Sequence, residues 1–271
     1  MQDLNLSTIK HIHFIGIGGI GISALAKMAL SRGMKVSGIN DEEGKTVDSL
    51  TELGVDILVS KGPFDMVPEA DMYVYSDAWI YRGPEVLESA RKTGKLTLSY
   101  FEALGIFAKE YKVIAIAGTH GKTTTTAMVA EILVDACLDP TVIVGSFVKK
   151  FGSNFRKGES KYLVVEADEY NRHFLNFHPY ITVITNIEAD HLDCYKDLAD
   201  IQSAFDKLVS QSENTVKDYS KYLDKLPKLS VPGIHNRLDA AAAYAVAEML
   251  NIDSKIIEES LSQFSGTWRR L

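Results

Sequence analysis

The sequence predicts an α/β protein of two successive domains, each built on a parallel sheet. Apolar, β-branched runs alternate with helix-prone segments, and two of these runs lead directly into a glycine-rich turn followed by a helix. The chain has 271 residues, whereas a single domain typically has about 100–200. We therefore expect two domains, and we place their boundary near residue 110.

The composition is that of an ordinary globular protein, with 46% hydrophobic and 24% charged residues. A net charge of −7 argues against a general nucleic-acid surface. No apolar run is long enough to span a bilayer, and the N-terminus lacks the apolar core of a signal peptide. Cys137 and Cys194 are too few for a disulfide framework, so we expect free thiols and a cytoplasmic location.

The first glycine turn predicts a Rossmann-like βαβ unit. Strands are expected at residues 11–15 and 35–39, with a helix at 22–32 between them. In such units the turn takes a phosphate, and an acidic residue after the second strand takes ribose hydroxyls. Asp41, 20 residues past Gly21, has that place, although it is equally well explained as a carboxylate exposed to water. The turn itself contains Gly16, Gly18, Gly19 and Gly21.

The alternation continues to the end of the first domain. The predicted strands are 56–59, 72–75 and 96–99, and the predicted helices are 47–53, 84–93 and 100–111. Parallel sheets bind ligands at the carboxyl ends of their strands. Ser76 directly follows a strand, so it is either a ligand contact or a simple turn residue.

The second glycine turn predicts a phosphate-binding loop. The apolar run 113–117 meets Gly118-Thr-His-Gly-Lys-Thr-Thr, and a helix-prone segment follows. Lys122 is placed to reach terminal phosphates, and the Thr123 hydroxyl to hold Mg²⁺. The usual motif has glycine where this chain has Ile116, so the loop is a shorter variant. An ordinary strand–helix turn that contains Gly-Lys is the alternative.

Polar residues follow two later strands, 162–166 and 180–185, and a further strand is expected at 140–145. Because parallel strands end at the same sheet edge, Glu166, Asn186 and His191 should converge on the phosphate loop. A carboxylate at Glu166 suits Mg²⁺, which prefers oxygen ligands. Local roles are the alternative: helix or turn capping for Asp168, Glu169 and His191, and exposure to water for Glu188 and Asp190.

The last part of the chain is less regular. A helix is expected at 197–209, where Lys207 looks solvated, and residues 210–228 are polar with little strand character. The segment Pro232-Gly-Ile-His-Asn236 then precedes an alanine-rich helix predicted at 240–250.

Together these motifs resemble the Mur ligase family, and its alanine-adding branch in particular. The resemblance rests on Gly16-Ile-Gly-Gly-Ile-Gly-Ile-Ser23, Gly118-Thr-His-Gly-Lys-Thr-Thr, Glu166-Ala-Asp-Glu and Thr185-Asn-Ile-Glu-Ala-Asp-His191. It implies a reaction in which ATP phosphorylates the carboxylate of UDP-N-acetylmuramate, and L-alanine attacks the acyl phosphate to form an amide. It also implies a UDP-sugar-binding domain at 1–110 and a central P-loop-type ATP-binding domain at 111–266.

The resemblance also implies residue roles. Lys122 would steady the γ-phosphate, Thr123 and Glu166 would hold one Mg²⁺ and His191 a second, and Asn186 would help to place the acyl phosphate. The expected UDP-sugar contacts are Gly16, Gly18, Gly19, Gly21, Ser23, Asp41 and Ser76. The expected ATP contacts are Gly118, Thr119, His120, Gly121, Lys122, Thr123, Thr124, His235, Asn236, Asp239 and Arg270.

Three departures from the family pattern stand out. Asp239 has the place of a usual Asn, and only 43 residues separate His191 from His235, where the family has extra strands. Residues 267–271 resemble the start of a linker to a third domain, which we expect to be absent. On this basis we expect the chain to bind ATP and to ligate poorly.

Three other functions stay open at this point. The first is a related ligase that joins a whole peptide to UDP-N-acetylmuramate, and the second is a nucleotide-binding module without catalysis. The third is a dehydrogenase that uses Gly16–Gly21 for NAD, which the second phosphate loop disfavours.

Overall fold

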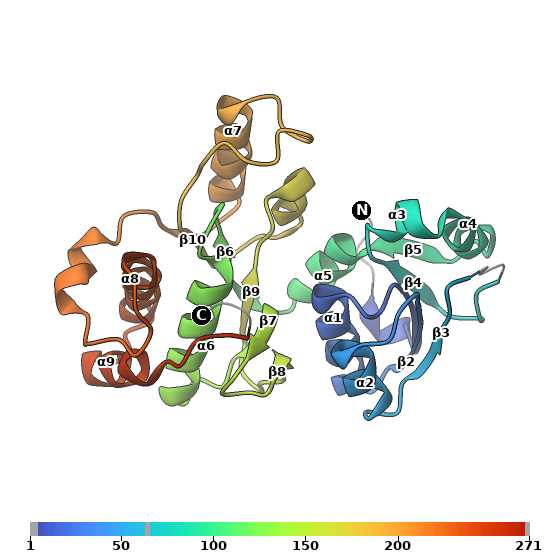
Figure 1. The fold of residues 1–271 in the computed structure, drawn as a ribbon, viewed down its shortest axis with the longest axis horizontal. Coiled ribbons are helices and arrows are strands. Elements are labelled where there is room, and N and C mark those ends of the chain that lie inside the picture. Colours follow the sequence, from blue (N-terminus) through green and yellow to red (C-terminus); the bar gives the residue numbers. More distant parts are fainter. Residues whose placement is uncertain (1–4, 63–65, 269–271) are drawn as a thin grey trace. The chain divides into compact units, whose positions relative to one another are not determined.

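The computed structural model describes residues 5–62 and 66–268, which fall into two compact units, 1–107 and 108–271 (Figure 1). The first unit holds a five-stranded, wholly parallel sheet in the order β3-β2-β1-β4-β5. The strands are β1 (His11–Ile15), β2 (Lys35–Asn40), β3 (Asp56–Val59), β4 (Met72–Tyr75) and β5 (Leu96–Ser99). All five strands expected in this part of the chain are confirmed.

The helices of the first unit are η1 (Leu6–Thr8), α1 (Ile20–Ser31), α2 (Lys45–Thr51), α3 (Trp79–Arg82), α4 (Pro84–Lys92) and α5 (Tyr100–Ala108). The short helices η1 and α3 were not predicted from the sequence. Pro84 begins α4, where its missing N–H removes no helical hydrogen bond. The apolar face of α4 packs with Ile15, Ile39 and Tyr73 of the sheet in one buried cluster.

The second unit holds a six-stranded sheet in the order β11-β10-β6-β9-β7-β8. Its strands are β6 (Lys112–Ala117), β7 (Thr141–Val148), β8 (Ser153–Arg156), β9 (Tyr162–Glu166), β10 (Ile181–Ile184) and β11 (Asn214–Val216). Every pairing is parallel except that of β7 with β8, which is antiparallel. Strand β8 was not predicted from the sequence. The expected strands at 113–117, 162–166 and 180–185 are thus neighbours in the sheet.

Helix α6 (Lys122–Asp135) follows the phosphate loop and packs against α8 (Ile234–Met249) and α9 (Ser254–Gln263) as well as the sheet (Figure 1). It is buried on most of its sides, polar residues such as Thr125, Thr126 and Glu131 included, as expected for a helix enclosed between other elements. Alanines 240–243 of α8 are fully buried in the same cluster. Short side chains there allow the two helices to approach closely. The other helices are η2 (Tyr170–Asn176), α7 (Leu198–Ser210) and η3 (Ser220–Lys225).

Two expectations for the last part of the chain are wrong. Helix α8 begins at Ile234 rather than at residue 240, so His235, Asn236 and Asp239 lie on its first two turns. The polar stretch 210–228 contains β11, which pairs with β10 from Ile181 opposite Asn214. Pairing with a buried neighbour outweighs weak local strand propensity. Among the described residues, every helix is too short or too polar to cross a bilayer.

Candidate functional site

The phosphate loop lies between the end of β6 and the start of α6. Gly118 and Gly121 have φ angles of 138° and 82°, which side chains rarely adopt. A Cβ atom on Gly118 would collide with Thr185, and one on Gly121 with Asp239. Helix α6 begins at Lys122, so the positive end of its dipole faces the loop. The predicted strand–loop–helix arrangement is therefore present, with the backbone geometry that glycine permits.

Glu166 and Thr123 come together at the sheet edge. The Thr123 hydroxyl donates a 3.1 Å hydrogen bond to Oε2 of Glu166, and the Gly145 N–H donates to Oε1. Strand β9 pairs with β6 up to Ile116 opposite Glu166, and this register brings the carboxylate to the loop. Two oxygens suitable for Mg²⁺ are thus adjacent, where the sequence placed them.

Lys122 contacts Glu169, a carboxylate that the sequence analysis did not place in the site. The Lys122 ammonium donates to both Glu169 oxygens, at 2.7 and 2.9 Å, and Glu169 is only 3% exposed. No spacing rule identifies this partner, because Glu169 lies beyond the end of β9 in a loop.

Asn186 fastens the phosphate loop to the end of β10. Its Oδ1 accepts a 2.8 Å hydrogen bond from the His120 N–H, and its backbone oxygen accepts from the Thr119 N–H. Its amide nitrogen donates to Glu188, whose own N–H donates to the Thr119 hydroxyl. Glu188 therefore does more than face water, and Asn186 holds the loop in place.

His191 lies beside the same cluster. Its Nε2 is 3.5 Å from Glu169 and 3.8 Å from Asp190, and its ring makes an edge contact with Tyr170. Its φ of 55° is unusual for a residue other than glycine. The expected convergence of Glu166, Asn186 and His191 around the loop is thus present in the structure, whereas Asp168 caps a local turn through the Tyr170 N–H.

A cavity of about 640 Å³ opens beside the loop. Burial raises the pKa of Asp239 to about 7, although a hydrogen bond from Thr125 opposes the shift. Tyr219, which the sequence analysis missed, donates its hydroxyl to the Thr185 oxygen at the cavity wall. The lining residues are His120, Gly121, Thr124, Thr185, Asn186, Tyr219, His235, Asn236, Leu238 and Asp239. Predicted ATP contacts from the loop and from α8 therefore share one cavity, and Arg270 lies outside the described residues.

Protein side chains alone do not form a closed metal cage here. Over residues 5–62 and 66–268, no group of three or more His, Cys, Asp or Glu is arranged to hold a metal ion. Mg²⁺ typically takes one or two protein oxygens together with substrate phosphates and waters. The adjacent oxygens of Thr123 and Glu166 fit that pattern.

The first glycine turn, in the other unit, is shaped by its neighbours. A Cβ atom on Gly16 would collide with the Trp79 ring, and Ser76 lies next to the same glycine. Asn40 accepts a 3.0 Å hydrogen bond from the Gly18 N–H, a contact that the sequence analysis missed. Asp41 pairs instead with Arg82, at 3.0 Å.

Two other predicted contacts of this unit lie on α1. Ser23 is fully buried, and its hydroxyl donates to the Ile20 oxygen within the helix. In this conformation Ser23 therefore presents no exposed atom to a ligand. Gly21 faces the Tyr100 ring, which a Cβ atom would approach to 2.9 Å.

Comparison with known families and proteins agrees with this geometry. The model of the "Mur ligase middle domain" matches residues 116–225, and that of the "Mur ligase family, catalytic domain" matches residues 11–112. The UDP-N-acetylmuramate–L-alanine ligase of Clostridium tetani is 35% identical, over 98% of this chain and 68% of the relative. The chain belongs to the Mur ligase family.

Solved structures of Mur ligases share its fold. The UDP-N-acetylmuramate–alanine ligase of Thermotoga maritima superposes with a TM-score of 0.85 at 31% identity, over 96% of this chain and 70% of that one. The UDP-N-acetylmuramate:L-alanyl-γ-D-glutamyl-meso-diaminopimelate ligase of Neisseria meningitides gives a TM-score of 0.82 at 28% identity, over 96% and 100%. Enzymes of this family are ATP-dependent, amide-forming ligases, and the predicted family and α/β fold are confirmed.

This Mur ligase is shorter than its relatives within the matched region. The alignment with the C. tetani enzyme runs over 314 positions, more than the 271 residues of this chain, so the relative has segments that this chain lacks.

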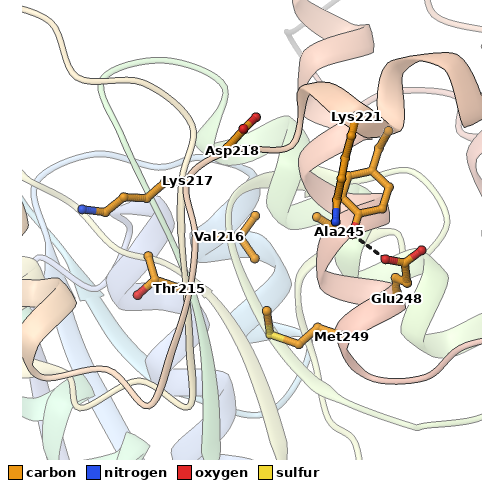
Figure 2. A pocket seen from close by; sticks show the side chains of 9 residues that line it. Thr215, Val216, Lys217, Asp218, Lys221, Ala245, Glu248 and Met249 are labelled. Carbon is orange, nitrogen blue, oxygen red and sulfur yellow. Dashed lines mark hydrogen bonds between the residues drawn. The ribbon is translucent and has the colours of Figure 1, made fainter.

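The outer strand β11 borders a second cavity, of about 480 Å³. Figure 2 shows Val216 and Met249 on two sides of this cavity, with Lys217 pointing away from Met249. The phosphate loop contributes no residue to it.

Proposed function

We propose that this chain is an ATP-dependent ligase of peptidoglycan precursor synthesis that acts on UDP-N-acetylmuramate and L-alanine. One observation carries the proposal: Lys122, Thr123 and Glu166 meet at a phosphate loop in a chain 35% identical to a UDP-N-acetylmuramate–L-alanine ligase. A cytoplasmic reaction is part of the same proposal, and the free cysteines Cys137 and Cys194 support it, because free thiols persist in a reducing compartment.

In the proposed reaction, an oxygen of the substrate carboxylate attacks the γ-phosphorus of ATP and ADP leaves. The amino group of L-alanine then attacks the carbonyl carbon of the acyl phosphate, loses a proton, and displaces phosphate. Lys122 and the N-terminus of α6 supply positive charge where the phosphates lie. Thr123 and Glu166 would hold Mg²⁺, which neutralises phosphate charge when bound, and His191 would hold a second ion.

The cavity next to the loop is the proposed site of the nucleotide base. His235, Asn236 and Asp239 reach it from α8, His120 from the loop and Thr124 from the first turn of α6. Asn186 is proposed to act mainly by fixing the loop that meets the acyl phosphate, since it holds two loop N–H groups.

The first unit is proposed to bind the UDP part of the sugar nucleotide. Gly16, Gly18, Gly19 and Gly21 form its glycine turn and the start of α1, and Ser76 lies beside Gly16. Among the predicted contacts, Asp41 and Ser23 are engaged by Arg82 and Ile20. Both would have to change partner to reach the ligand.

The test is an assay of amide formation from UDP-N-acetylmuramate, L-alanine and ATP, with the product identified by mass spectrometry. We expect L-alanyl product at any measurable rate, and a loss of about 100-fold or more in Glu166→Gln, since charge stabilisation dominates such reactions. Glu159→Gln, an exposed carboxylate remote from the loop, is the control. ATP binding without phosphate release would contradict catalysis.

A second candidate substrate is a whole peptide, because the Neisseria structure at 28% identity is named as a tripeptide ligase. L-alanine is favoured because the C. tetani relative is more similar. Offering both acceptors in one reaction distinguishes them: preferential consumption of the tripeptide would overturn the choice of L-alanine. A rise in melting temperature with NAD would instead favour a dehydrogenase.

A further inference from the structure

The Lys122 ammonium is fully occupied in the structure. It lies 2.7 and 2.9 Å from the two Glu169 oxygens, 2.6 Å from the Gly118 oxygen and 3.3 Å from the Thr119 oxygen. An ammonium has three protons to donate. Four acceptors already surround them, so a phosphate oxygen can reach Lys122 only if one of these acceptors is displaced.

Glu169 is held where it is by its own backbone. Its carbonyl oxygen accepts hydrogen bonds from the Tyr195 hydroxyl and from the Arg172 N–H. The residues Asn171 and Arg172 have φ angles of 47° and 60°, in the left-handed region. Strain of this kind persists only where the surrounding structure enforces it, and it clusters at functional sites. The Lys122–Glu169 pair is therefore a built contact, in contrast to a mobile surface ion pair.

Glu169 is also in the right place to compete with a nucleotide. Its carboxylate is 3% exposed and lies between Lys122 and His191, which is 3.5 Å away. In phosphate loops the lysine must reach the β- and γ-phosphates. The γ-phosphate and Glu169 thus need the same ammonium.

We propose that Glu169 is a positioning residue that holds Lys122 while the loop is empty and releases it to the terminal phosphate of ATP. The proposal rests on the proposed function, since it assumes ATP at this loop. In this proposal the Glu169 carboxylate competes with the γ-phosphate for Lys122. This competition sets how strongly the loop discriminates ATP from ADP.

The direction of the effect follows from the empty state. In Glu169→Gln the half-buried Lys122 loses its anionic partner, which destabilises the empty protein more than the ATP complex. Binding then restores a partner. We expect ATP to bind about tenfold more tightly, because hydrogen bonds between charged groups contribute about that factor. ADP, which lacks the γ-phosphate, should gain much less.

The experiment measures ATP and ADP dissociation constants by calorimetry for the wild-type chain, Glu169→Gln and Glu131→Gln. Glu131 is the matched control because it is 5% exposed and lies on α6 beyond the reach of Lys122. A selective gain for ATP in Glu169→Gln alone supports the proposal. Weaker ATP binding, or equal changes for ATP and ADP, would overturn it.

Thermal unfolding provides an independent readout. Without nucleotide, Glu169→Gln should melt below the wild type, and saturating ATP should remove most of that difference. If Glu169 had a purely structural role, its replacement would lower the melting temperature equally with and without ATP. That result would overturn the proposal even if the variant is poorly folded at higher temperature. Failure of the wild type to bind ATP would instead refute the proposed function.

Discussion

At the scale of single residues, Asp239 makes stability depend on pH. Burial raises its pKa to about 7, so the folded protein binds a proton there more tightly than the unfolded chain. Protonation of Asp239 therefore contributes to the free energy of unfolding, and this contribution is fully present near pH 4 and is lost as the pH rises through 7. The ionised form is therefore the costly one in the folded state.

Asp239→Asn should remove this dependence, because an amide has no charge to bury. At pH 8 we expect the free energy of unfolding to rise by on the order of 2–4 kcal/mol, and the difference should vanish near pH 4. Urea unfolding at several pH values measures it. Asp224→Asn, at an exposed position, serves as the control. A difference that is constant across pH would contradict the burial argument.

Residue chemistry was predictable from the sequence where it depends on local spacing. Lys122, Thr123 and Glu166 were expected at the loop and lie there. For Glu169 the sequence offered only turn capping as a local alternative, and it offered no role for Asn40. Their partners, Lys122 and Gly18, are set by the path of loops that no motif describes.

At the scale of elements, the contact between α6 and α8 depends on small side chains. Ala243 is fully buried in the cluster that both helices share. Ala243→Leu adds volume to this close-packed region and should lower the free energy of unfolding by about 1–3 kcal/mol. Denaturant unfolding checks this, with the exposed Met249→Leu on the same helix as control. Equal stability of the two variants would show that the interface can expand.

Elements followed the sequence closely where hydrophobic patterning was strong. The buried strands β6, β9 and β10 were expected within one or two residues. Strand β11 was not, because its Asn-Thr-Val segment has little apolar character and depends on pairing with β10. The start of α8 was also misplaced, because its first turn is polar and partly exposed.

At the scale of the whole molecule, each unit has its own buried cluster. We therefore expect two calorimetric unfolding transitions. ATP should raise the free energy of unfolding of the second unit, which contains Ala243, and UDP-N-acetylmuramate should raise that of the first unit. Each gain should be about 3 kcal/mol at a hundredfold excess over the dissociation constant. A single transition that responds to both ligands would contradict this assignment.

The sequence by itself determined the α/β fold, the phosphate loop and the family resemblance. These follow from short-range order: an apolar strand, a glycine turn with Gly-Lys-Thr and a helix in direct succession predict a phosphate loop. Only the tertiary structure decided that Glu169 holds Lys122, that Asp239 is buried against Gly121, and that β11 completes the sheet. Each of these contacts joins segments far apart in the chain, so it depends on how β6, β9, β10 and α8 pack together.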